Sequence, residues 1–300
     1  MRRALAAITT ALAFIAISGT DTGAQQTRKL FVSVTSASGM PVDGLPASAF
    51  TVVEDGTPGK TVKVEPVAWP VKLTLLVDNG SQASEYLQDL RAALHNFFDA
   101  LHSDIETTLI TVAPQPRFIV RPTKDRDQLA KGIDLITPDP GTGKFFDGVK
   151  EAADRAVKDK TDFFPVFFVI SSNLNEKDPP LDFQIKKTEQ QLLDRAATVH
   201  FIQFTTKVQS GAGVTGAITT DFGIALTQLT GGRYDNINSF SRLRTLLPEY
   251  ATQIERSVTH QAHQYRITYT SSVKMPNSFS VRVDAPPTSV IELSADGHLP

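Results

Sequence analysis

The chain has 300 residues, of which 41% are hydrophobic and 21% are charged, and its formal net charge is −2. This composition supports one sizeable core with a smaller second unit, and it excludes a wholly disordered chain. No long run of one charge sign occurs, so nothing directs the chain toward nucleic acid or an acidic membrane surface. The absence of cysteine excludes disulfides, thiolate nucleophiles and thiolate metal sites.

The segment 1–24 has the pattern of an export signal. Arg2 and Arg3 give a positive start, an apolar stretch follows over 4–17, and small residues end the segment at Ala24. We expect cleavage after Ala24 and a mature protein in the periplasm or outside the cell. The alternative is a membrane anchor, but the apolar run is shorter than the ~20 residues needed to cross a bilayer. We expect no membrane span in the mature chain.

Residues 25–72 are expected to form strands and turns. Leu30, Val32 and Val34 alternate with Phe31, Ser33 and Thr35, which is the period of a strand. Further strands are expected at 50–54 and 61–67. A tight-turn dipeptide, Asp55-Gly56, separates the last two. This stretch has no helical period.

From residue 73 the pattern changes to short apolar runs that alternate with amphipathic segments. Strands are expected at 73–77, 107–112, 118–120, 164–170 and 199–204. Helices are expected at 84–101, 129–136, 146–156, 185–196, 222–229 and 243–258. This alternation predicts an α/β fold over residues 73–260, with a doubly wound, mainly parallel sheet of Rossmann-like type covered by helices on both faces.

The carboxyl ends of the parallel strands should meet at one edge of this sheet, because crossover connections are right-handed. A ligand site is expected at that edge, which is formed by Val77, Val112, Ile170 and Phe204. The tail, residues 261–300, returns to strands. We expect the N-terminal and C-terminal strands to form a small β unit together.

Several segments resemble motifs of von Willebrand factor type A domains. Residues 75–81 (Leu-Leu-Val-Asp-Asn-Gly-Ser) resemble the first strand of that family and the loop after it. A later loop and helix start of the family is resembled by residues 141–149. The strand that usually ends Ser-Asp-Gly is resembled by residues 167–173, and the Thr-Gly-Gly-Arg segment by residues 229–233.

The flanks narrow this resemblance. Residues 42–56 and 265–269 resemble the flanks of the exported "VWFA-related" proteins that are abundant in acidobacteria. The resemblance therefore extends over roughly the whole mature chain, and it implies a von Willebrand factor type A-like domain with β-rich flanks.

The resemblance also implies a Mg²⁺ site made of an Asp-x-Ser-x-Ser loop, a distant threonine and a second aspartate, because a hard cation prefers oxygen ligands. Asp78 matches the first aspartate. Gly80 and Gln82 stand where the two serines belong, although Ser81 lies between them.

The other two positions also depart from the family pattern. Gly143 stands at the threonine position, with Thr142 one residue earlier, and Ser172 replaces the second aspartate. Two interpretations stay open. One is a weakened, degenerate metal site that uses Asp78, Ser81 and Thr142. The other, which we favour, is that Asp78 only accepts hydrogen bonds from backbone N–H groups of the following turn.

Binding of a partner does not require the metal, because the strand-end loops can contact it directly. The residues expected in these loops are Asn79, Gly80, Gly143, Lys144, Ser172 and Asn173. The chain lacks a complete phosphate-binding loop, a His-Glu-x-x-His segment and a Gly-x-Ser-x-Gly segment.

The leading hypothesis is an exported protein-binding module, adhesive or scaffolding, that has no cofactor, is not an enzyme and binds an unidentified protein or cell-surface ligand. The first alternative is a divalent-cation-dependent adhesion protein that uses Asp78. The second is a hydrolase with an unrecognised site, for which the α/β pattern alone is no evidence.

Overall fold

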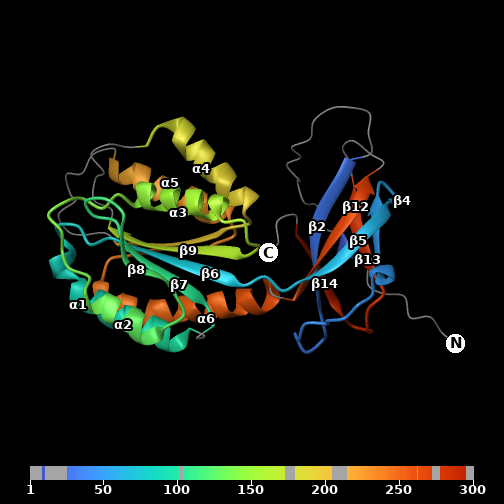
Figure 1. Ribbon diagram of the computed structural model, residues 1–300, viewed down its shortest axis with the longest axis horizontal. Helices are drawn as coiled ribbons and strands as arrows, with labels where there is room; N and C mark the ends of the chain where they lie inside the picture. Colours follow the sequence, from blue (N-terminus) through green and yellow to red (C-terminus); the bar gives the residue numbers. More distant parts are fainter. Residues whose placement is uncertain are drawn as a thin grey trace. The chain divides into compact units, whose positions relative to one another are not determined.

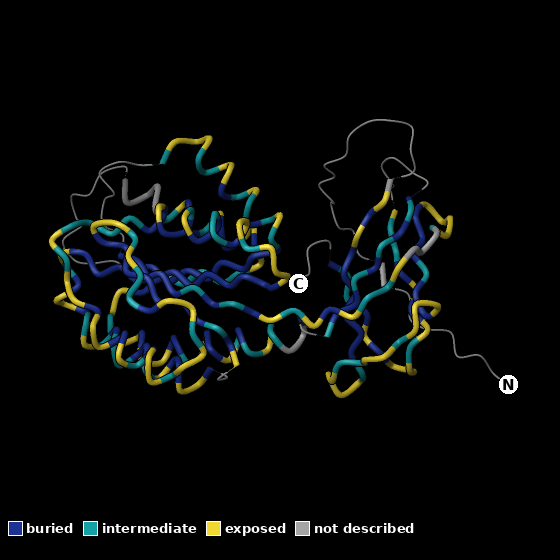
Figure 2. The backbone as a smooth tube through the Cα atoms, in the orientation of Figure 1, coloured by how far each residue is buried: buried dark blue, intermediate teal, exposed yellow. Residues whose placement is uncertain are grey.

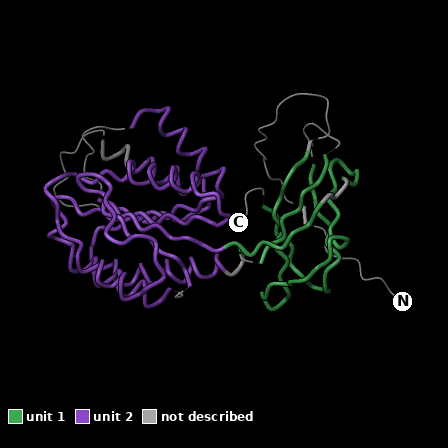
Figure 3. The backbone as a smooth tube through the Cα atoms, viewed as in Figure 1, with its two compact units in different colours: residues 1–69, 259–300 green, residues 70–258 purple. Residues whose placement is uncertain are grey.

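The computed structural model describes residues 9–10, 26–101, 104–172, 180–204, 215–261, 263–271 and 278–294 (Figure 1). The chain divides into two compact units (Figure 3). The β unit consists of Met1–Trp69 and Thr259–Pro300, and the α/β unit of Pro70–Val258. The α/β unit is thus inserted between the two parts of the β unit.

The sheet of the α/β unit contains six strands among the described residues: β6 (Val71–Val77), β7 (Glu106–Thr111), β8 (Arg117–Thr123), β9 (Phe164–Ser172), β10 (Thr198–Phe204) and β11 (Tyr234–Ile237). Their order is β11-β10-β9-β6-β7-β8. All neighbours are parallel except β8, which runs antiparallel to β7 and pairs Phe118 with Ile110. The mainly parallel sheet is confirmed.

Helices cover both faces of this sheet (Figure 1; burial is shown in Figure 2). On one face lie α1 (Leu87–Ala100), α2 (Arg126–Asp134) and α6 (Leu243–Gln261). On the other lie α3 (Phe145–Lys158), α4 (Asp182–Asp194) and α5 (Thr215–Leu229). Because both faces are covered, all nine residues of the inner strand β9 are buried.

The start of α1 differs from the sequence-based expectation of one helix over residues 84–101. A short 3-10 turn, Ala83–Glu85, comes first, and α1 begins only at Leu87. Between them Tyr86 leaves helical geometry, with φ −124° and ψ −3°. Its ring packs against Phe204, which holds the chain at this break.

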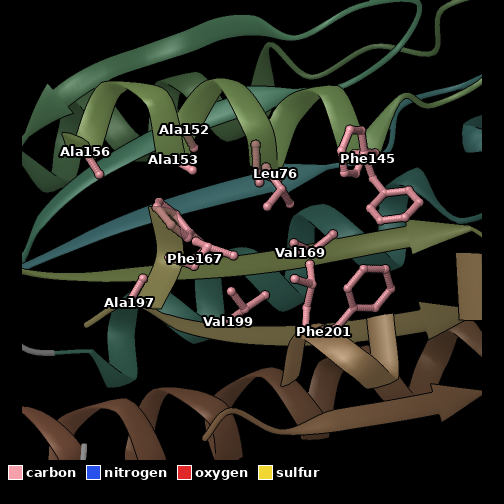
Figure 4. Close-up of a cluster of buried hydrophobic side chains, with 14 of the residues drawn as sticks. Leu76, Phe145, Ala152, Ala153, Ala156, Phe167, Val169, Ala197, Val199 and Phe201 are labelled. Atoms are coloured by element: carbon pink, nitrogen blue, oxygen red, sulfur yellow. The ribbon is translucent and has the colours of Figure 1, made fainter. Parts of the chain in front are cut away.

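The core between the sheet and α3 is shown in Figure 4. Alanines on α3 and Phe145 at its start pack against aromatic and branched side chains of the strands (Figure 4). Each fully buried large side chain contributes roughly 1.5–3 kcal/mol. The cluster includes Leu76, Phe145, Ala152, Ala153, Ala156, Phe167, Val169, Val199 and Phe201.

Within the described part of the β unit, the strands form two sheets. One has the order β14-β2-β12-β5, and the other the order β1-β13-β3-β4. Each sheet contains strands from both ends of the sequence, which confirms the expected joint β unit. The bounds are β1 (Thr9–Thr10), β2 (Gln26–Thr35), β3 (Phe50–Glu54), β4 (Thr57–Pro58), β5 (Lys60–Val67), β12 (Gln264–Ser271), β13 (Phe279–Val283) and β14 (Val290–Ser294).

A buried ion pair connects the two sheets of the β unit. Arg28 on β2 lies 2.8 Å from Glu54 on β3, and only 8% and 1% of these side chains are exposed. Glu54 also accepts hydrogen bonds from the hydroxyl groups of Tyr269 (3.0 Å) and Ser271 (2.6 Å) on β12. Burial and the Glu54 charge raise the pKa of Tyr269 to about 12.

Apart from Thr9–Thr10, the expected signal segment 1–24 lies outside the described residues.

Candidate functional site

The carboxyl ends of the parallel strands meet at one edge of the α/β sheet, as expected, and we call it the strand-end edge. Asp78 directly follows β6 and Ser172 ends the neighbouring strand β9. The two strands are held in register there, because the backbone N–H of Asp78 donates to the carbonyl of Ile170 (2.8 Å). Asp78 and Ser172 are both buried. Asn173, which follows Ser172, lies outside the described residues.

From residues that the structure describes, the carboxylate of Asp78 accepts three hydrogen bonds. The N–H of Gly80 donates to Oδ1 (2.8 Å). The N–H of Ser172 donates to Oδ2 (3.1 Å), and its hydroxyl donates to the same oxygen. Burial raises the pKa of Asp78, and the hydrogen bonds from Ser172 and Gly80 oppose this rise. The side chain thus acts as an acceptor for the turn after β6 and for the end of β9.

The loop before α3 lies directly against this carboxylate at Gly143. A Cβ atom added to Gly143 would stand 2.5 Å from Oδ1 and 2.6 Å from Cγ of Asp78. At Gly80 an added Cβ atom would stand 2.9 Å from the carbonyl oxygen of Gly141 and 3.0 Å from Oδ1 of Asp78. Both glycines are therefore required by close contact, since any side chain would collide with its neighbours.

Asn79 connects two further loops and is 3% exposed. Its Oδ1 accepts a hydrogen bond from the N–H of Ala113 (3.0 Å), and its Nδ2 donates to the carbonyl of Thr137 (2.9 Å). Its own carbonyl accepts from the N–H of Asp139 (2.7 Å). These contacts leave Asn79 little surface for a partner, and they fix the loops after β7 and α2 to the turn after β6.

The remaining predicted residues lie on the outer side of the same loops. Ser81 is exposed, and its backbone N–H donates to the carbonyl of Gly141 (3.0 Å). Thr142 and Lys144 are half-buried, and the N–H of Lys144 donates to the carbonyl of Val112 (2.9 Å). The strand-end edge therefore has a buried inner row, formed by Asp78, Asn79 and Ser172. Around it lies an outer rim, which we define as the accessible residues of the same loops, including Ser81.

Two residues that sequence reasoning missed stabilise this edge. The Tyr86 hydroxyl donates to the backbone carbonyl of Asp78 (3.0 Å), and burial raises the pKa of this tyrosine. Arg117 donates to Asp139 Oδ2 (2.6 Å) and to the carbonyl of Ala113 (3.2 Å). Neither residue directly follows a parallel strand. A search of the residues at the carboxyl ends of the parallel strands therefore could not find them.

These residues do not fit the Mg²⁺ site that the family resemblance implies. Mg²⁺ requires near-octahedral oxygen ligands and gives up its waters reluctantly. Here both oxygens of Asp78 face donor hydrogens, and Gly143 lies against the carboxylate. Among the residues that the structure describes, no group of three or more His, Asp or Glu side chains could hold a metal ion.

None of the described helices is long and apolar enough to cross a membrane. No protein-family model matches the chain, and no curated protein matches it significantly in sequence.

Solved structures with a similar fold were found at low sequence identity. A von Willebrand factor type A protein from Catenulispora acidiphila has a TM-score of 0.50 and 8% identity, covering 91% of this chain and 73% of that chain. BatB, a conserved hypothetical protein from Bacteroides thetaiotaomicron, has a TM-score of 0.46 and 12% identity, covering 62% and 99%. The vWF domain of the type V pili tip protein Mfa5 from Porphyromonas gingivalis has a TM-score of 0.46 and 11% identity, covering 64% and 97%.

The strand order, the covered faces and the loops at one edge define a doubly wound α/β domain. More narrowly, the α/β unit has the von Willebrand factor type A fold, as the match to the Catenulispora protein shows. At this identity the similarity establishes the fold and nothing further about activity.

Proposed function

We propose that this chain is an exported, non-enzymatic binding module, of the adhesive or scaffolding kind, whose strand-end rim contacts a protein or cell-surface ligand without a cofactor. The observation that carries the proposal is the hydrogen-bonded closure of the strand-end edge. Asp78 and Ser172 bond to each other, and Asn79 bonds to two backbone groups. Side chains engaged in this way are poorly placed for acid–base or nucleophilic chemistry, which needs a group within reach of a substrate.

The rim around this closed row offers a surface of fixed shape. Three loops, after β6, after β7 and before α3, are joined by backbone hydrogen bonds. Exposed residues stand on each of them, among them Ser81, Pro114, Gln115, Pro138 and Pro140. A rim that is already ordered loses little conformational entropy when it binds, which favours affinity.

Single-cysteine crosslinking tests the proposal, because the natural chain has no cysteine to interfere. Ser81→Cys and Gln115→Cys each place a photoactivatable label on the rim. Lys160→Cys is the matched control, since Lys160 is exposed but lies before β9, at the opposite edge of the sheet. The labelled proteins are added to intact cells and to envelope extracts.

We expect both rim positions to crosslink one and the same species, in EDTA as well as in Mg²⁺, while the control position does not. Equal crosslinking from all three positions, or none from the rim, would contradict a binding role for this surface.

Export is tested by N-terminal sequencing of the protein recovered from cell fractions. The expected first residue is Gln25, and an intact Met1 in the cytoplasmic fraction would contradict export.

A further inference from the structure

The partners of the Asp78 carboxylate surround it on several sides, through hydrogen bonds and through close packing. Gly80 and Ser172 donate to it from two sides, and the backbone at Gly143 closes a third side. The donors turn their hydrogens toward both carboxylate oxygens, which is the opposite of what an incoming cation requires. For Mg²⁺ to bind Asp78, the hydroxyl of Ser172 would have to rotate away first.

The space beside the carboxylate is occupied in a matching way. A Cβ atom at position 143 would lie within 2.9 Å of Oδ1, Cγ and Oδ2 of Asp78. Contacts under 3.0 Å force a displacement, and here the displaced group would be a buried carboxylate. A hydroxyl-bearing side chain at Gly143 and the observed position of Asp78 therefore exclude each other.

The neutral residue at position 172 completes the set. An aspartate there would place a second carboxylate at hydrogen-bonding distance from Asp78, where both groups are 2–3% exposed. Two like charges at such a buried site repel each other strongly unless a cation lies between them. The Ser172 hydroxyl instead donates a hydrogen bond to Asp78.

We propose that Asp78, Ser172, Gly80 and Gly143 form a cation-free lock, in which hydrogen bonds to one buried carboxylate hold together the loops that a divalent cation would otherwise join. The lock ties the turn after β6 to the end of β9 and encloses the loop before α3. This deepens the proposed function, because the lock preforms the binding rim in the absence of metal. Its test nevertheless needs only the purified protein.

The first measurement is the unfolding midpoint of the protein in EDTA and in millimolar Mg²⁺ or Mn²⁺. A cation that binds only the folded state raises this midpoint by mass action. We expect no shift for the natural chain. A cation-dependent rise that disappears in Asp78→Asn would overturn the lock.

The second measurement uses variants at position 172. Ser172→Ala removes one hydrogen bond to the carboxylate, and we expect its midpoint to fall by roughly 3–10 °C in either condition. The matched control is Ser171→Ala, because Ser171 is equally buried but its hydroxyl donates to the carbonyl of Ser172 and not to Asp78. We expect the unfolding midpoint of the control to fall by less than that of Ser172→Ala. An equal fall in midpoint would argue against the lock.

The third measurement restores a second carboxylate. Ser172→Asp should have a lower midpoint than Ser172→Ala in EDTA, and Mg²⁺ or Mn²⁺ should recover part of the difference. A midpoint in EDTA equal to that of the natural chain would contradict the lock. If this variant does not fold, the first two measurements still decide. A confirmed lock without any rim-specific crosslink would refute the proposed function alone, and a cation-dependent midpoint with a rim-specific crosslink would refute the lock alone.

Discussion

Two consecutive glycines, Gly231 and Gly232, determine how the end of α5 meets the neighbouring strand. After α5, Gly231 has a φ of +66°, which lets the chain leave the helix in the left-handed region. Gly232 lies against β10, where an added Cβ atom would stand 1.8 Å from the carbonyl oxygen of Val199. The adjacent Thr230 hydroxyl accepts a hydrogen bond from the N–H of Val199 (2.9 Å). Helix end and strand are thus joined directly.

These two glycines make a matched pair for mutation. We expect Gly232→Ala to lower the unfolding free energy by roughly 3 kcal/mol, because the methyl group collides with a strand backbone that cannot move aside. Gly231→Ala should cost only about 1 kcal/mol, the strain of a left-handed alanine. Urea denaturation measures both. Similar losses for the two variants would mean that the approach to Val199 does not limit this position.

The sequence locates part of the strand-end edge and misses another part for a physical reason. Asp78 and Ser172 can be found because each stands where a buried strand stops. The hydrogen bonds of the Asn79 side chain to Ala113 and Thr137 cannot be found from the sequence. They depend on loops that come together only in the folded chain. One carboxylate suits a metal or the backbone equally well, so the sequence leaves the role of Asp78 open; its observed partners are Gly80 and Ser172.

At the scale of elements, the strand–helix alternation of the α/β unit is predictable and the details of pairing are not. The apolar runs of β6, β7, β9 and β10 can each be found, because strands covered on both faces are rich in apolar residues. In the β unit the long strands β2 and β12 are predicted as separate segments. Their direct pairing, and the division into two sheets, depend on contacts across more than two hundred residues. Local periodicity carries no information on such contacts.

One ion pair joins the start of β6 to the end of α3 and gives the α/β unit a pH dependence. Lys72 Nζ lies 2.9 Å from Asp159 Oδ2, and the N–H and hydroxyl of Thr161 donate to Oδ1 (2.9 and 2.7 Å). The hydrogen bond from Lys72, followed by those from Thr161, holds the pKa of Asp159 well below its usual value.

A depressed pKa means that the unfolded chain takes up the proton first as the pH falls. The contribution of Asp159 is therefore present above its unfolded pKa, near pH 4, and is lost progressively below it. Since the pair is partly exposed, we expect no more than about 1 kcal/mol. Asp159→Asn should show a smaller loss of unfolding free energy than the natural chain between about pH 5 and pH 2. The exposed Asp162→Asn serves as control, and identical acid profiles for all three proteins would contradict the assignment.

At the scale of the whole molecule, each unit has its own hydrophobic core. The cluster of the α/β unit contains residues from Leu76 to Leu226, and that of the β unit contains residues from both terminal segments, such as Val32 and Ile267. A unit with its own core has the means to fold alone. The family resemblance of the sequence covers both units, but the fold of each follows from its own pattern.

We expect the fragment 70–258 to fold by itself as a cooperative unit. A second polypeptide, in which 26–67 is joined to 264–294 by a short Asn-Gly turn, should form the β unit, because Val67 and Gln264 are already partners in adjacent strands. Dispersed amide spectra and a single unfolding transition would verify each fragment. A fragment 70–258 that stays unfolded would show that the inserted unit depends on its host.

The insertion also determines how the molecule would respond to tension. The chain leaves the β unit after β5 and re-enters it at β12, and these two strands are hydrogen-bonded side by side. A pulling force applied between Gln26 and Ser294 would first act on β2 and β14, which pair with each other. Since β5 and β12 clamp both entry points of the α/β unit, no force reaches that unit until they separate. Under mechanical strain, the rim would keep its shape while the β unit extends.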